Sequence, residues 1–217
     1  MARIRTYSTP HKGLRNLLNQ FSDLAGQTDY ADLAQVNKLK TLGNDLFAFL
    51  DEHAQIENDF VLKPLEARAK NASDHDKHDH EEIEVQQAAL KRHLESLDGA
   101  QDQDAGHDFY LAASSFHSRY LEHIYHEETV TEKLMWEHFT EEELMGITGQ
   151  ILQSIPPQKM MTMLKYIIPA QNEAENLKIL SGMKANAPKP AFEAVLATIK
   201  PVMSAERYQS LAQKLGV

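Results

Sequence analysis

Hydrophobic positions in the first part of the chain recur every three or four residues, which is the spacing of helices with one buried face. In the stretch 8–26, Ser8 and Thr9 are the predicted caps and Pro10 suits the first helical turn. Gly26 marks the expected end of this helix. Its inward stripe contains His11, Leu14, Leu18, Phe21 and Leu24.

Three longer stretches continue this pattern and predict three more helices. The second covers about 30–60, with Pro64 expected to kink or end it. The third follows a polar stretch at 71–79, where Ser73 is the expected cap, and the fourth covers about 109–138. The predicted stripe of the second helix includes Leu33, Val36, Leu39, Leu46, Phe49, Leu50 and Ile56, and that of the fourth Phe109, Phe116, Tyr120, His123, Glu127, Val130 and Leu134.

The pattern changes after Thr140, where prolines and glycines interrupt the stripes. Thr140 and Glu143 have the spacing of a capping box. We therefore predict an all-α chain, with an up-and-down four-helix bundle over 1–139 and three to five short helices over 140–217 packed on one side of it. The core contacts expected from this second segment are Met160, Met161, Met163, Leu164, Leu196 and Leu211.

Charge and composition narrow the classes of function. The 217 residues carry a formal net charge of −10, which disfavours nucleic acid and anionic membranes as partners because both attract clustered Lys and Arg. The chain contains no cysteine, so any metal must be held by nitrogen and oxygen atoms. No apolar run reaches the roughly 18 residues of a membrane span. With no secretory signal pattern at its start, we expect a cytoplasmic protein.

Within the inward stripes of three helices, a histidine and a glutamate stand four residues apart, which is about one helical turn. The pairs are His53 with Glu57, His80 with Glu84, and His123 with Glu127. His11 adds an inward imidazole from the first helix. Burying four imidazoles and three carboxylates together is costly without cations. The pattern therefore predicts a centre for two metal ions.

Simpler interpretations apply to single residues. A lone inward histidine such as His11 is more often a satisfied core residue, and one His-x-x-x-Glu pair is usually a surface pair; three pairs in phase favour metal. His126 competes with His123 as a ligand because the two lie only about 60° apart around the same helix. His75 and His78 fit a solvated helix start. Tyr120 fits core packing or a hydrogen bond to a metal ligand.

The chain resembles the hemerythrin-like, or HHE cation-binding, family over about residues 8–139. The resemblance is carried by His11, His53-Ala-Gln-Ile-Glu57, His80-Glu-Glu-Ile-Glu84 and His123-Ile-Tyr-His-Glu127. It implies two non-haem iron ions with an oxo or hydroxo bridge. One would be held by His11 and His53, the other by His80, His123 and Glu84, with Glu57 and Glu127 bridging. The C-terminal third resembles the helical tail of some bacterial members.

Glu84 departs from the oxygen-carrying members, which have a histidine there and, one residue later, an aspartate in place of Glu127. A third carboxylate is a hard anionic donor, so it stabilises ferric iron and lowers the reduction potential. This difference disfavours reversible dioxygen carriage and makes manganese and zinc alternative ions.

Three functions remain open at this point. The first is a protein that binds or senses dioxygen, peroxide or nitric oxide, or that handles iron. The second is a di-iron oxidase, peroxidase or ferroxidase. The third is a structural metal clamp that leaves interactions to 140–217. A channel from solvent to the metal ions would disfavour the structural clamp. The sequence assigns no catalytic residues and no oligomeric state.

Overall fold

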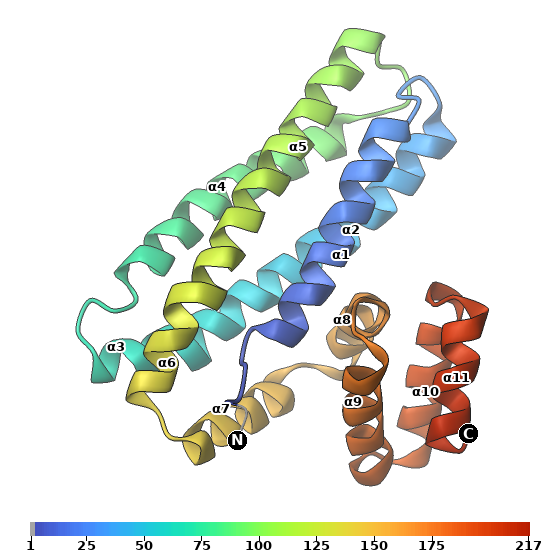
Figure 1. Cartoon of the computed structure of the whole chain (residues 1–217). Helices are drawn as coiled ribbons and strands as arrows, with labels where there is room; N and C mark the ends of the chain where they lie inside the picture. The colour runs from blue at the N-terminus through green and yellow to red at the C-terminus, as the bar shows by residue number, and fades with distance from the viewer. Residues whose placement is uncertain (1–2) are drawn as a thin grey trace.

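The computed structural model describes residues 3–217, and these residues form helices and no strand. Four long helices make an up-and-down bundle (Figure 1), in which α1 and α4 each contact both α2 and α5. The bundle consists of α1 (Ser8–Gln27), α2 (Leu33–Glu57), α4 (Asp74–Ser96) and α5 (Gln103–His126). The predicted all-α bundle is therefore confirmed.

Two of the bundle helices widen into π-helical turns at their C-terminal ends. The turn η1 (Asn58–Leu62) joins α2 to α3 (Lys63–Arg68), and η2 (Glu127–Thr131) joins α5 to α6 (Glu132–His138). Pro64, near the start of α3, has no N–H to donate to the carbonyl group of Phe60, which favours the wider turn at η1. A π turn adds one residue, so the side chains beyond it face a different direction than in a straight helix.

This extra residue overturns part of the stripe predicted for the fourth helix. Val130 is 42% exposed, whereas Thr131 and Met135 are buried. A strict helical period cannot anticipate the insertion. Leu33, predicted to face inward, is also exposed because it is the first residue of α2 at the end of the bundle.

Two predicted caps differ in the structure. α1 begins at Ser8 and has Tyr7 at its cap position without a side-chain cap, so Ser8 and Thr9 are helical residues. Ser73 occupies the cap position of α4, but its hydroxyl donates to Glu66 Oε2 at 2.7 Å instead of capping the helix. The preference for Ser and Thr at the N-cap of a helix identifies candidate residues, but it does not determine which hydrogen-bond partner the hydroxyl has in the folded chain.

The C-terminal helices begin with α7 (Glu141–Ser154), which starts with the predicted capping box of Thr140 and Glu143. They continue with α8 (Pro157–Ala170), α9 (Glu173–Asn186), α10 (Lys189–Ile199), the 3-10 turn η3 (Lys200–Val202) and α11 (Ala205–Leu215). α8 packs against α1, and it shares a separate hydrophobic core with α9, α10 and α11 (Figure 1). A boundary at residue 139 between two units stays a prediction.

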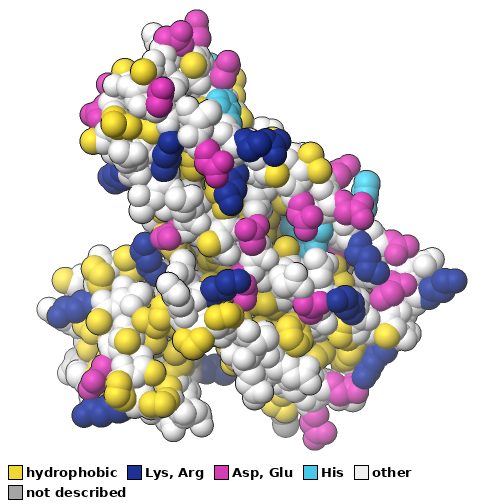
Figure 2. Space-filling model, turned by 180° about the vertical axis from the view of Figure 1, so that it is seen from behind, with side chains coloured by type: hydrophobic (Ala, Val, Ile, Leu, Met, Phe, Trp, Pro, Cys, Tyr) yellow, Lys and Arg dark blue, Asp and Glu magenta, His cyan; other side chains and the backbone are white. Residues whose placement is uncertain are grey.

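The surface is mixed in charge. Figure 2 shows acidic and basic side chains interspersed over the face opposite to that of Figure 1, with histidine side chains reaching the surface on the bundle. None belongs to the C-terminal helices, because no histidine follows His138. Within residues 3–217, no helix is both long and apolar enough to span a bilayer.

α1 and α8 approach each other closely at Gly13. A Cβ atom added there would lie 2.6 Å from Ile167 Cγ1 and 3.0 Å from Ile167 Cα. One turn further along α1, the Asn16 amide donates to the Tyr166 carbonyl oxygen at 3.0 Å. The hydrogen bond and the missing side chain together fix how α8 lies on the helix that carries His11.

We predict that Gly13→Ala lowers the free energy of unfolding by about 1–3 kcal/mol, because the new methyl group meets a backbone atom that cannot move aside. Gly146→Ala is the matched control, since Gly146 lies in α7 with nothing within 4 Å of an added Cβ. That variant should gain about 0.5–1 kcal/mol from helix propensity. Denaturant unfolding of the full chain measures both, and equal effects would contradict the close contact.

Candidate metal centre

Six of the seven predicted ligands meet in the core between the four bundle helices, and all six are buried. Their donor atoms fall into two groups, and the atoms of each group lie within 4.8 Å of one another. The first group is His11, His53, Glu57 and Glu127, and the second is Glu57, His80, His123 and Glu127. Each of the four helices supplies at least one donor, so the centre forms only when the bundle closes.

The two glutamates belong to both groups. Glu57 Oε1 lies 3.0 Å from His53 Nε2, and Glu57 Oε2 lies 3.5 Å from His80 Nε2. Glu127 likewise turns Oε2 toward the first group, while its Oε1 lies 3.4 Å from His123 Nε2. Each carboxylate therefore presents one oxygen to each group, which is the arrangement that bridges two ions.

Several atoms at the centre are buried without a partner among the described residues. Glu57 Oε2, His80 Nε2 and both carboxylate oxygens of Glu127 make no hydrogen bond there. Burying a carboxylate without a compensating partner costs several kcal/mol or more. Imidazole and carboxylate donors suit iron, zinc and manganese. The residues present therefore fit a pair of such ions.

Protons compete with cations for these donor atoms. Burial and the charge of Glu57 raise the pKa of Glu127 to about 8. Burial lowers the pKa of His11, but its hydrogen bonds to Glu128 and Glu57 outweigh this and raise the pKa to about 9. Burial likewise opposes protonation of His80, whereas Glu127 and Glu57 raise its pKa to about 10. Both imidazoles must lose a proton before they can bind a metal ion.

A second layer of side chains faces the Nδ1 atoms of three imidazoles. His11 Nδ1 is hydrogen-bonded to Glu128 at 3.0 Å and His80 Nδ1 to Asn58 at 3.3 Å, whereas His123 Nδ1 lies 3.4 Å from Asp79 without a hydrogen bond. Arg15 donates to Glu128 and Arg119 donates to Asp79, each at 2.7 Å, which keeps both carboxylates charged. Such contacts fix the ring orientation and increase its basicity in metal sites. The sequence pattern missed them because the partners come from different helices.

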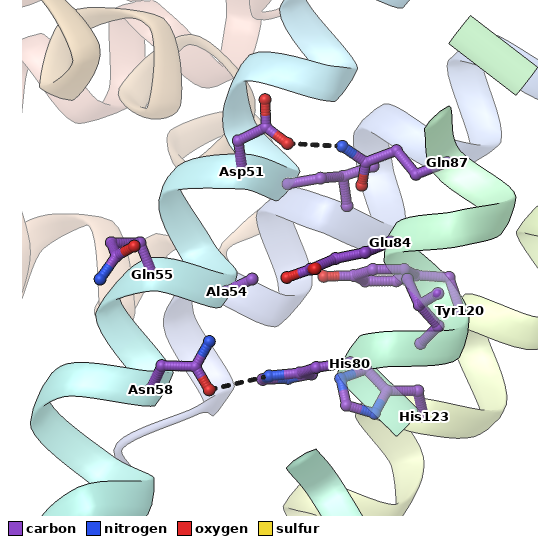
Figure 3. Close-up of a pocket in the computed structure, with 11 residues that line it drawn as sticks. Asp51, Ala54, Gln55, Asn58, His80, Glu84, Gln87, Tyr120 and His123 are labelled. Carbon is purple, nitrogen blue, oxygen red and sulfur yellow. Dashed lines mark hydrogen bonds between the residues drawn. The ribbon is translucent and has the colours of Figure 1, made fainter. Parts of the chain in front are cut away.

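A cavity of about 130 Å³ reaches the second group from the surface between α2, α4 and α5. Figure 3 shows His80, His123, Tyr120 and Glu84 on one side of it, opposite Asn58 of η1. Tyr120 is buried, and burial together with the charges of Glu57 and Glu127 raises its pKa well above the usual value. This cavity gives the second group a route to solvent.

The remaining candidates lie outside both groups. Glu84 is exposed on the cavity wall, so its role as a seventh ligand stays a prediction. His126 is partly buried and is not a member of either group. Tyr7 was not anticipated: it is buried, its ring lies 5.1 Å from that of His11, and its hydroxyl has no partner among the described residues. No helical pattern includes Tyr7, so the sequence offered no signal for it.

Fold and site together define a helical bundle that binds metal ions. The chain matches the hemerythrin HHE cation binding domain family over residues 3–145 and belongs to that family. It is also similar to F-box/LRR-repeat protein 5 from Mus musculus and from Bos taurus, with 22% identity over 176 residues in each case. These matches cover 79% of this chain and 25% of the relative, so the chain spans about a quarter of each relative's length. No solved structure matches it.

We predict that Glu57→Gln lowers the metal content below two ions per chain, because Glu57 contributes an oxygen to both groups. A bound ion present at a hundred times its Kd stabilises the fold by about 2.7 kcal/mol, so the variant should lose most of the rise in Tm that metal produces. Glu52→Gln is the control: Glu52 is on the same helix and pairs with Lys159, away from both groups. Metal analysis with thermal unfolding tests this, and an unchanged metal content would refute the ligand set.

Proposed function

We propose that this chain is a non-haem di-iron protein that binds dioxygen, peroxide or nitric oxide at the iron ion of the second group. His11 and His53 would hold one ion, and His80 and His123 the other, with Glu84 as an additional ligand from the cavity wall. Glu57 and Glu127 would bridge the ions. When bound, two ferrous ions supply the electrons that such ligands accept.

The observation that carries this proposal is the cavity beside the second group. Its volume, about 130 Å³, has room for a few water molecules or a diatomic ligand. Pockets for drug-sized organic molecules typically occupy about 300–1,000 Å³. The cavity therefore favours a small inorganic ligand over a large organic substrate, and an open route to the site disfavours a closed structural clamp.

The side chains of the cavity suit this use. Tyr120 has a high pKa, so its hydroxyl keeps its proton and can donate a hydrogen bond into the site. Asn58, on the opposite wall, accepts from His80 Nδ1 and so holds that ring toward the second group. Glu84 stands at the exposed side of the same cavity, where its carboxylate can approach a cation from solvent.

We predict two iron ions per chain after expression in iron-supplemented medium, and charge-transfer bands when the anaerobically reduced protein meets air, peroxide or nitric oxide. Reversible bands without consumption of ligand support binding or sensing. Irreversible bands with peroxide consumed would support an oxidase or peroxidase instead. Zinc alone, or no metal, would overturn the proposal. Ultraviolet-visible spectra and metal analysis of one preparation distinguish these outcomes.

A second prediction concerns Glu84. Glu84→Gln should keep both ions, because the donors of the second group remain, but it should weaken binding of one ion and shift the charge-transfer bands. Glu81→Gln is the matched control, an exposed glutamate on the same helix that does not line the cavity. Metal affinity and spectra that match the wild type in both variants would remove Glu84 from the ligand set.

A further inference from the structure

A third group of metal-binding side chains lies outside the buried pair, at the start of α4 and the end of α5. It consists of His75, Asp76 and His126, whose donor atoms lie within 4.8 Å of one another. The Asp76 Oδ1 atom lies 3.6 Å from His75 Nδ1 and 3.6 Å from His126 Nε2. None of the three residues belongs to either buried group, so these side chains need a separate explanation.

Asp76 is the residue of this group whose burial most needs an explanation. Its side chain is only 1% exposed, which is unusual for an aspartate at the first turn of a helix. Thr131 donates to its Oδ2 at 2.6 Å, but Oδ1 is buried without a hydrogen-bond partner among the described residues. This unpaired oxygen is the one that faces the two imidazoles. A buried carboxylate oxygen directed at two histidines without bonding to either lacks its compensating charge.

The distances suit a shared cation better than hydrogen bonds. Hydrogen bonds between nitrogen and oxygen span about 2.7–3.2 Å, so 3.6 Å is too long. Two ligand atoms on a tetrahedral ion with bonds of about 2.0–2.1 Å are separated by about 3.3 Å. A movement of a few tenths of an ångström therefore converts the observed spacing into a coordination sphere.

The two imidazole rings are stacked, with centroids 3.8 Å apart and planes inclined by 15°. The nitrogen lone pair of an imidazole lies in the plane of its ring, so the lone pairs of two parallel rings do not converge on one point. One ring must therefore tilt before both can bind the same ion. His75 can do so because its side chain is 58% exposed, while His126 is more enclosed and Asp76 is fixed by Thr131.

We propose that His75, Asp76 and His126 form a third, mononuclear site for a divalent transition-metal ion such as Zn²⁺, separate from the buried pair. Zinc in proteins binds both imidazole nitrogens and carboxylate oxygens, and the exposed side of the site leaves positions for water. Arg119 holds the nearby Asp79 at 2.7 Å, which leaves Asp76 as the carboxylate of this site. The proposal does not depend on which ions fill the buried pair.

The test uses the full chain with its buried pair already saturated by the metal it carries as purified. Equilibrium dialysis against Zn²⁺, with total metal analysis, should show one additional zinc per wild-type chain and no loss of the first metals. His75→Ala and His126→Ala should each weaken this extra binding by about tenfold or more, with the content of the first metals unchanged. Far-ultraviolet circular dichroism checks that both variants are folded.

His78→Ala is the matched control. His78 is an exposed histidine on the same helix, and it pairs with Glu82 at 3.3 Å outside the group. It should bind the extra zinc as the wild type does. The proposal is overturned if no extra zinc binds, if zinc only replaces the first metals, or if all three histidine variants lose binding equally, which would indicate nonspecific surface binding. Co²⁺ in place of Zn²⁺ should give visible bands that His75→Ala and His126→Ala weaken and that His78→Ala leaves unchanged.

Discussion

Glu57 and Glu127 face each other inside the bundle, and three of their four carboxylate oxygens have no hydrogen-bond partner among residues 3–217. Removing two such groups from water costs several kcal/mol for each charge. This penalty is comparable to the whole free energy of unfolding of a domain, which is only about 5–15 kcal/mol. Four imidazoles around them reduce this cost, and bound metal ions would offset it further. The four bundle helices, the side chains that contact the imidazoles and the cavity all surround these two carboxylates.

The π-helical turns tie the glutamates to the rest of the structure. Glu57 is the last residue of α2 before η1, and Glu127 is the first residue of η2, so each carboxylate shared by the two groups stands where its helix widens. The wider turn at η2 places Thr131, its last residue, inward, where it donates to Asp76. It also buries Glu132, which accepts from the Thr6 backbone N–H at 2.6 Å and so anchors the segment that leads into α1. One local change in the backbone therefore supports both the buried centre and its surroundings.

The C-terminal helices contribute to the same end by holding α1. The Gln171 side chain donates to the Thr9 carbonyl oxygen at 3.1 Å, and Lys12 pairs with Glu175 at 2.6 Å, on either side of His11 in the sequence. Ile155, Met163, Tyr166 and Ile167 also join the hydrophobic core of the bundle. His11 is the only buried-group ligand that α1 supplies. The position of this one imidazole therefore depends on contacts from a segment that lies far along the chain.

The sequence by itself determined the four bundle helices and six side chains of the centre, because the helical period places residues four apart on one face regardless of what that face meets. It could not determine what depends on neighbours from other helices. The oxygen of Glu57 that faces each group, the support of His11 by Glu128, and the place of Tyr7 follow only from packing. The period also failed at η2, where an inserted residue exposes Val130 and buries Thr131. Local pattern fixes the face of a helix, whereas tertiary structure alone decides which atoms meet there and where solvent can enter.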